Sequence, residues 1–154
     1  MGGTGRDWSL PEDVKPPYVV DLPTFSYSQK HVGHLTVVEG GHKCPLPFVP
    51  MRSFWITDIP AGVTRGDHAH KDQFQAIVAV SGRFVVDVSG YSPLGATRWQ
   101  LTSPSQALVI PPMNWTLLRD FSLDAVALVF TNGWYDESDY FRDKDKYMAA
   151  FKKP

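Results

Sequence analysis

The chain has 154 residues, a net charge of −1 at pH 7 and one cysteine, and its acidic and basic residues are interspersed. This length fits a single domain with a sizeable core, and the absence of a lysine or arginine run argues against nucleic acid as a partner. A lone cysteine excludes an internal disulfide, no apolar stretch of about 18 residues is available to span a membrane, and no apolar signal region follows the N-terminus, so a cytoplasmic location is expected.

The N-terminal part of the chain divides into an irregular segment and several short strands. Residues 1–17 contain glycines and prolines without periodicity, which predicts a flexible tail or arm, and residues 18–154 are predicted to form one domain. Strands are predicted at 18–22, 33–39 and 53–58, with a long connection rich in glycine and proline before the third.

The clearest hairpin is predicted at residues 74–88, where two apolar strands flank a turn at Ser81 and Gly82. Side chains alternate along a strand, so Gln73 and Gln75 share one face with Ile77, and both amides are predicted to face a polar cavity. Further strands are predicted at 97–101, 107–110, 115–119 and 125–131. Many short strands with closely spaced turns indicate a sandwich or jelly roll.

The final segment changes to a helical period, with Tyr140, Tyr147 and Phe151 on one face. Asp136 and Asp139 stand at its start, where acidic side chains favour the helix dipole and the free N–H groups. We therefore predict one C-terminal helix and interpret these acids as capping groups, not as a carboxylate site.

Two histidines, His68 and His70, form the centre of the most informative stretch. In a strand they project from the same face, with Cα atoms roughly 6.5 to 7 Å apart. Imidazole titrates near neutral pH and also ligates metals, so the pair can shuttle protons between neighbouring atoms of a substrate or chelate an ion.

These residues carry a family resemblance. Gly62, His68, His70, Gln75 and Gly82 resemble the first conserved motif of the cupin superfamily, whose fold is a double-stranded β-helix or jelly-roll barrel. Residues 65–71 (RGDHAHK), 110–115 (IPPMNW) and 135–142 (YDESDYFR) together resemble the WxcM-like, QdtA- and FdtA-like sugar 3,4-ketoisomerases. Three separated motifs in the right order are a specific signal. The resemblance implies an all-β cupin barrel with one short C-terminal α-helix.

The resemblance also implies a reaction. Enzymes of this family move the carbonyl of a thymidine-diphosphate-linked (dTDP-linked) 4-keto-6-deoxy sugar from C4 to C3, and they are generally homodimers. A C4 ketone acidifies the proton on C3, so a base that is active near pH 7 can remove it, and no redox cofactor is needed. By analogy His70 is the expected base, with His68 assisting or orienting.

The predicted substrate-binding residues surround this pair. Arg52 or Arg65 is expected near the phosphates or the enolate oxygen, and Gln73 and Gln75 are expected in the cavity. The set is completed by three residues: Trp55, Trp115 and His34. Trp115 could stack on a base or a sugar, although a tryptophan on a strand is more often packed in the core or its rim.

Two alternatives follow from departures in the sequence. Metal-binding cupins usually hold the metal with three histidines and a glutamate. Here Gln75 and Thr116 stand at two of those positions, which favours a metal-free site over a metal-dependent enzyme. The family's usual Arg-Val-Tyr-Tyr-Ile strand corresponds to residues 52–56, where Phe54 and Trp55 replace the tyrosines, and a family arginine becomes Val32. Losing such groups leaves open a cupin that binds a sugar or nucleotide without catalysis.

Overall fold

The computed structural model describes residues 14–26, 32–90 and 95–151. One sheet contains β1 (Tyr18–Asp21), β4 (Arg52–Ile56), β6 (Gln75–Ser81), β9 (Gln106–Ile110) and β11 (Val126–Thr131). A second contains β5 (Arg65–His70), β7 (Phe84–Ser89), β8 (Thr97–Leu101), β10 (Trp115–Arg119) and β12 (Tyr140–Phe141). Outside them lie β2 (Thr24–Ser26), β3 (His34–Thr36), the 3-10 helices η1 (Gly41–Lys43) and η2 (Glu137–Asp139), and α1 (Lys144–Ala149).

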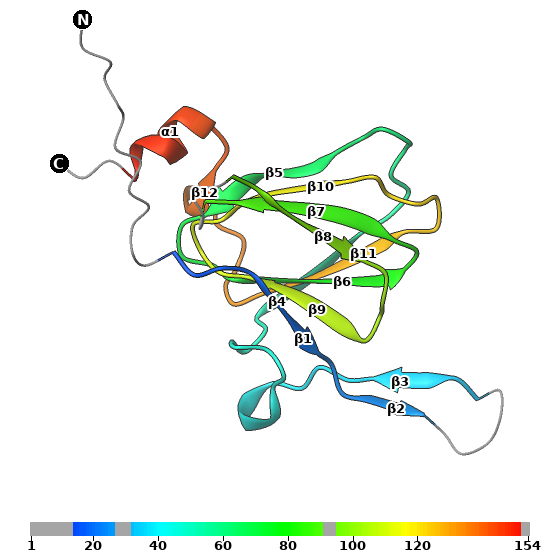
Figure 1. Ribbon diagram of the computed structural model, residues 1–154. Coiled ribbons are helices and arrows are strands. Elements are labelled where there is room, and N and C mark those ends of the chain that lie inside the picture. Colours follow the sequence, from blue (N-terminus) through cyan, green and yellow to red (C-terminus); the bar gives the residue numbers. More distant parts are fainter. Residues whose placement is uncertain (1–13, 27–31, 91–94, 152–154) are drawn as a thin grey trace, which may run out of the picture.

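The two sheets face each other, and the β2–β3 pair extends away from them (Figure 1). The strand orders are β1-β9-β6-β11-β4 and β12-β5-β10-β7-β8, and every pairing within the described ranges is antiparallel. Consecutive strands alternate repeatedly between the sheets, which is the connectivity of a jelly roll. The fold is therefore the all-β cupin barrel with one short C-terminal helix that the sequence predicted.

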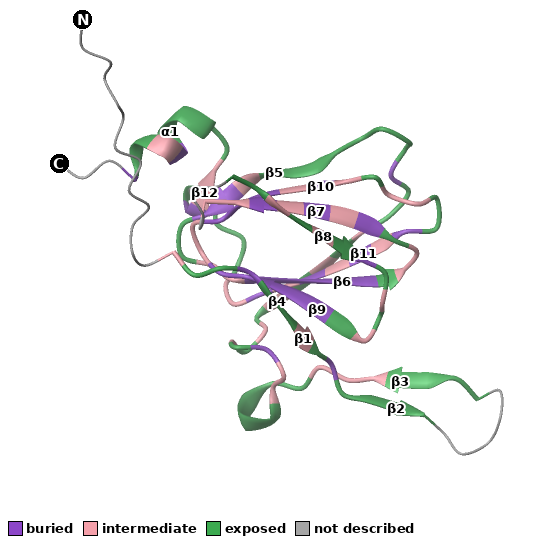
Figure 2. Ribbon diagram, viewed as in Figure 1, coloured by how far each residue is buried: buried purple, intermediate pink, exposed green. Residues whose placement is uncertain are grey.

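The core lies between the two sheets because alternate residues of their strands point inward. It consists of buried apolar side chains from β6 to β11: Ile77, Ala79, Phe84, Val86, Val88, Leu101, Leu108, Ile110, Leu118, Ala125, Ala127 and Val129. On β6 the neighbouring residues Ala76 and Val78 belong to a separate cluster on the outer face of the first sheet. Both faces of β6 are thus covered, and the buried colour concentrates on β6, β7 and β9, whereas β2 and β3 are largely exposed (Figure 2).

The predicted hairpin at residues 74–88 is wrong in its pairing. Both strands form, but β6 pairs with β9 and β11, whereas β7 pairs with β8 and β10. The turn at Gly82, whose φ is 64°, carries the chain from one sheet to the other. A hairpin and a crossover between facing sheets both bury two apolar strands joined by a tight turn, so the local pattern does not distinguish them.

The C-terminal segment is less helical than predicted. Asp136 does act as a cap, since its side chain accepts from Ser138 N, but it caps the single turn of η2. The chain then extends through β12, and α1 begins only after a second cap at Asp143. Tyr140 and Phe141 pair with β5 because an exposed strand edge offers them backbone hydrogen bonds there.

The last residues of the predicted N-terminal arm pack against this end of the barrel. Val14 contacts the cluster of Ala69, Trp115, Tyr147 and Phe151, which covers the outer face of the second sheet. Residues 1–13 lie outside the described part of the chain. Among the described residues no helix is both long and apolar enough to cross a bilayer.

Candidate active site

A β-bulge shapes β5 just before the two histidines. Thr116 of β10 pairs with His68, but Leu117 pairs with Gly66, so Asp67 is the extra residue of the bulge. Gly66 and Asp67 have φ values of 80° and 58°. A Cβ atom on Gly66 would lie 2.9 Å from the Thr116 carbonyl oxygen, so glycine is required for this close approach.

Beyond the bulge, His68 and His70 project from the same face of β5, as predicted. Their ring centroids are 5.0 Å apart, and the rings meet edge to face. Ala69, between them, packs on the opposite face under Trp115 and α1. The alternation of the strand thus separates a polar inner face from an apolar outer one.

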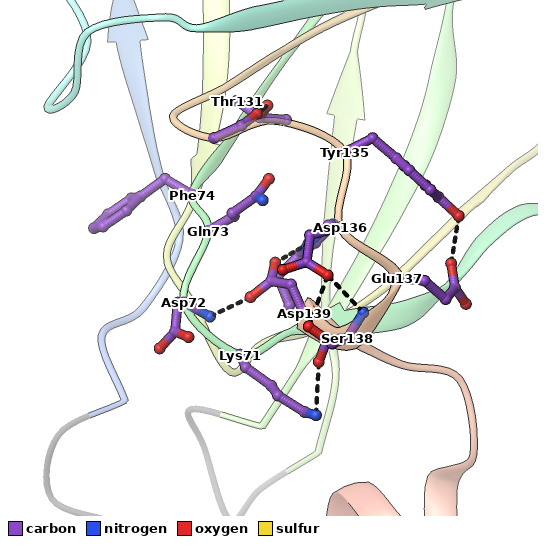
Figure 3. A network of polar contacts seen from close by, with 12 residues as sticks. Lys71, Asp72, Gln73, Phe74, Thr131, Tyr135, Asp136, Glu137, Ser138 and Asp139 are labelled. Carbon is purple, nitrogen blue, oxygen red and sulfur yellow. Dashed lines mark hydrogen bonds and ion pairs between the residues drawn. The ribbon is translucent and has the colours of Figure 1, made fainter.

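A buried carboxylate, Asp139, holds His70 in place. Asp139 Oδ2 lies 2.8 Å from His70 Nδ1, and the two side chains are only 6% and 4% exposed. Asp139 Oδ1 accepts a hydrogen bond of 2.8 Å from the backbone N–H of Asp72 (Figure 3), so the carboxylate is itself fixed. An ionised carboxylate only accepts, and therefore His70 carries its proton on Nδ1 and leaves the lone pair on Nε2.

Three nitrogens of this pair are buried without a protein partner, and of the two rings only that of His68 lines the cavity described below. His70 Nε2 and both ring nitrogens of His68 have no hydrogen-bond partner within the described residues. Burial lowers the pKa of His70 below its ordinary value of 6.5, against the opposing effect of the hydrogen bond that His70 donates to Asp139. Burial, together with the charge of His70, lowers the pKa of His68 to about 4. Both imidazoles are therefore neutral at pH 7, and each can accept a proton.

A cavity of about 400 Å³ opens beside His68, between the two sheets. Its lining combines an apolar wall with polar groups from β5, β6, β10 and the C-terminal segment: Phe54, Ile56, Thr64, Arg65, Gly66, His68, Gln75, Ile77, Thr116, Leu118, Val129, Tyr140 and Arg142. His70 lies against two of these side chains, since its ring centroid is 5.0 Å from that of His68 and 4.4 Å from that of Tyr140. The volume is that of a site for a small organic ligand.

Tyr140 and Arg142 come to this cavity from β12 and the residue after it. Tyr140 is the β-sheet partner of His70, and the guanidinium carbon of Arg142 lies 4.3 Å from the centre of the Tyr140 ring. Glu137 fixes Arg142 through two hydrogen bonds, from Nε at 2.5 Å and from Nη2 at 3.0 Å. Tyr135 donates a further hydrogen bond to Glu137 (Figure 3). The donated hydrogen bonds, that of Arg142 first, lower the pKa of Glu137 to about 2, so its charge is permanent at neutral pH.

Three of the predicted substrate-binding residues lie at or beside this cavity. Arg65 and the buried Gln75 line it. Arg52 Nε donates to Thr131 Oγ1 at 3.3 Å, and the charge of Arg52 contributes to lowering the pKa of His70. Its Nη2 atom is buried without a hydrogen-bond partner in the described part of the chain, which leaves the two N–H donors of this atom for a ligand.

The other four predicted substrate-binding residues point elsewhere. Trp115 is buried on the outer face, where it contacts Tyr147 and donates from Nε1 to Asp67, because Thr116 takes the inward position on β10. Trp55 is 67% exposed and is absent from the cavity lining, but it lines an adjoining groove that shares Phe54, Ile56 and Arg65 with the cavity.

His34 and Gln73 also lie away from the cavity lining. His34 is exposed on β3, where its Nδ1 is 2.8 Å from Ser26 Oγ. Gln73 Nε2 donates to the Trp134 carbonyl oxygen at 2.8 Å, so this amide ties two loops together. Gln73 precedes β6, and the chain bends there, so the alternation that correctly placed Gln75 did not extend to it.

The residues at the usual cupin metal positions are gathered but are poor ligands. His68, Gln75 and Thr116 line the same cavity, which supports the alignment made from the sequence. An amide and a hydroxyl bind transition metals weakly, so only the two histidines of this set are strong ligands. Within residues 14–26, 32–90 and 95–151, no group of three or more histidine, cysteine, aspartate or glutamate side chains could hold a metal ion.

Three residues of this site were missed from the sequence: Asp139, Tyr140 and Arg142. The acids of this segment were interpreted as helix caps, and Asp139 is instead the buried partner of His70. The available signal was the third motif of the resemblance, residues 135–142, which contains all three. Hydrophobic periodicity does not reveal these residues, because the segment reaches the site through a strand of two residues, which is too short to show a period.

Comparison with known proteins decides the family. The family model FdtA, described as WxcM-like, C-terminal, matches residues 17–152. The chain belongs to this family. A relative from Aneurinibacillus thermoaerophilus, named TDP-4-oxo-6-deoxy-alpha-D-glucose-3,4-oxoisomerase, is 32% identical over 123 residues, which cover 79% of this chain and 84% of the relative.

Solved structures of sugar 3,4-ketoisomerases have the same fold. A histidine-to-asparagine variant of the 3,4-ketoisomerase QdtA from Thermoanaerobacterium thermosaccharolyticum, in complex with TDP-4-keto-6-deoxyglucose, matches with a TM-score of 0.79 and 30% identity over 87% of this chain and 92% of that one. WlaRA from Campylobacter jejuni, a TDP-fucose-3,4-ketoisomerase, has a TM-score of 0.79 and 24% identity over 90% and 97% of the two chains.

Proposed function

We propose that this chain isomerises a dTDP-linked 4-keto-6-deoxy sugar and moves its carbonyl from C4 to C3 by histidine-mediated proton transfer. The observation that carries the proposal is the buried His70–Asp139 pair, joined at 2.8 Å beside a cavity of about 400 Å³. The names of the Aneurinibacillus relative and of QdtA support the same sugar-nucleotide class.

In this mechanism His70 is the carbon base. Nε2 removes the proton from C3, which the neighbouring C4 carbonyl acidifies, and an enediol or enediolate forms. The same nitrogen then returns the proton to C4, and the carbonyl appears at C3. Asp139 keeps Nε2 unprotonated before the reaction and stabilises the imidazolium in between, as a carboxylate does for a catalytic histidine.

Cationic side chains supply the groups that a nucleotide diphosphate requires. Arg65 lies at the cavity and makes no ion pair within the described part of the chain, so its guanidinium is free to bind a phosphate. His68 is neutral and retains one donor and one acceptor nitrogen for the sugar hydroxyls. The reaction is redox-neutral and needs no cofactor.

The test is incubation with dTDP-4-keto-6-deoxyglucose in D₂O, followed by NMR at C3 and C4. The expected results are loss of the C3 proton signal and formation of a 3-keto sugar. His70→Asn should abolish both, whereas His34→Asn, on the exposed β3 strand, serves as the matched control. An unchanged substrate after prolonged incubation with the wild-type protein would refute the proposal, leaving the binding or accessory cupin and the metal-dependent enzyme as alternatives.

The homodimer and the cytoplasmic location remain predictions of the proposal. Light scattering at micromolar concentration should give twice the 17.2 kDa mass of the chain. A monomeric mass would contradict the dimer without affecting the assignment of His70.

A further inference from the structure

The proposed reaction moves two protons, and the histidine base accounts for only one. While one proton passes from C3 to C4, a second must pass from the C3 oxygen to the C4 oxygen. A side chain that serves the oxygens must donate a proton at one moment and accept one at the next, as a phenol or a neutral imidazole does. The family resemblance places a phenol on β4, but Phe54 occupies the inward position there.

We propose that the phenol of Tyr140 carries the proton between the two sugar oxygens; this inference rests on the proposed function. Tyr140 lines the cavity, and its ring centroid lies 5.0 Å from His68 and 4.4 Å from His70. Its backbone pairing with His70 fixes it on the neighbouring strand of the same sheet. A phenol thus stands next to the carbon base although β4 provides none.

The hydroxyl of Tyr140 is free, in contrast with those of neighbouring tyrosines. Tyr135 donates to Glu137 at 2.5 Å, and Tyr147 donates to the Met113 carbonyl oxygen at 2.9 Å. Tyr140 makes no side-chain hydrogen bond to any residue in the described ranges, although it is half-buried in a polar site. Because this hydroxyl is not buried and Tyr140 lines the cavity, a ligand or water there can reach it.

Arg142 completes the arrangement by placing a positive charge against the Tyr140 ring. Its guanidinium is 4.3 Å from the ring centre and is fixed by Glu137, so the charge is pre-positioned. A fixed cation stabilises negative charge that develops on the phenol oxygen or on the enediolate. Its charge also contributes to lowering the pKa values of both histidines, which indicates that its field reaches the whole pair.

The step balances without a further reactant. As His70 removes the C3 proton, the C3–H electron pair forms the C3–C4 double bond, and the C4 oxygen takes the proton of the Tyr140 hydroxyl. The resulting phenolate then removes the proton from the C3 oxygen, whose electron pair forms the new carbonyl. The electron pair of the C3–C4 double bond then takes the proton from His70, which forms the new C–H bond at C4. Both side chains end as they began.

The experiment compares Tyr140→Phe with Tyr18→Phe, which removes an exposed phenol on β1, outside the cavity. Turnover and C3 exchange in D₂O are measured for both variants. Tyr140→Phe should lower kcat roughly 100-fold or more, the range for loss of an acid–base group, and should lower C3 exchange less, because His70 is intact. Tyr18→Phe should match the wild type.

A second measurement separates chemistry from structure. Replacing Tyr140 by 3-fluorotyrosine, whose phenol is more acidic, should shift the alkaline limb of the kcat profile to lower pH. The inference would be overturned if turnover of Tyr140→Phe stayed within threefold of the wild type, or if the alkaline limb did not move. If instead His68→Gln lost about 100-fold in kcat while Tyr140→Phe kept full activity, His68 would be the group that carries this proton. A wild-type protein that does not isomerise the sugar would instead refute the proposed function.

Discussion

Replacing Asp139 by asparagine tests the central pair most directly. Asparagine preserves the size of the side chain, and its oxygen can still accept the 2.8 Å hydrogen bond from Asp72 N, so the loop should remain folded. The change removes the charge and presents an N–H₂ group to His70. His70 is then driven toward the tautomer with its proton on Nε2, where it cannot act as a base.

The size of the effect follows from the bond that is lost. A hydrogen bond to a charged group contributes about 1.5 to 3 kcal/mol, so kcat should fall roughly 10- to 150-fold at 1.36 kcal/mol per factor of ten. The pH dependence of kcat/KM provides an independent test, because the direction in which its acid limb moves can be predicted. Asp139 raises the pKa of His70 against burial, so its loss should move the acid limb of kcat/KM to lower pH.

The assay is the initial rate of 3-keto sugar formation between pH 4.5 and 8.5, with circular dichroism as a check of folding. Asp124→Asn, in an exposed turn where it accepts from Ser122, is the matched control and should behave as the wild type. If Asp139→Asn kept kcat within threefold, or if its acid limb moved upward, the assignment of Asp139 as the positioning residue of His70 would fail.

Three further predictions concern binding and stability. Arg65→Gln should raise KM about tenfold with little change in kcat, since a hydrogen bond to a phosphate charge is lost, while Arg98→Gln, outside the cavity, should leave KM unchanged in steady-state assays. The pKa of His68 falls from 6.5 to about 4 on folding, so between pH 7 and 5 the unfolded chain binds more protons than the folded one. The free energy of unfolding should therefore drop by about 2 kcal/mol from this group as the pH falls from 7 to 5. Urea unfolding of His68→Gln should show a smaller drop. Gly66→Ala should cost about 1 to 3 kcal/mol in the same assay, because φ is 80° and the new Cβ would meet the Thr116 carbonyl.

The positions of most strands could be predicted because they depend on local patterns. The alternation of apolar residues located β8 and β10 to the residue and identified the inward face of β6, including Gln75. Pairing depends on distant segments, and for that reason β6 and β7 were wrongly joined into one hairpin although they lie in different sheets. Motif resemblance supplied the barrel that periodicity alone could not distinguish from a simple sandwich.

In the candidate site, too, residues that follow from local patterns or motifs could be predicted, whereas residues that depend on contacts between distant segments could not. Gln75 was identified because the alternation of β6 places it at the cavity, whereas His68 and Arg65 were identified through the family resemblance. Asp139 was misinterpreted because acids before an apolar helix usually cap it, and nothing local indicates that this one is buried against a histidine 69 positions earlier. Trp115 was placed in the site by residue type, whereas its position on the outer face follows from the bulge and the register of β10.

The contact between β12 and β5 also limits when the site can form during synthesis. The base comes from residue 70 and its carboxylate from residue 139, and a strand of only two residues joins them. During synthesis the barrel strands up to β11 emerge first, and domains assemble as the chain lengthens. The site can form only when the segment from Asp136 to Arg142 has emerged and docked. Catalytic activity therefore reports that this segment has docked, because a nascent chain without it has His70 but lacks the carboxylate that orients this base.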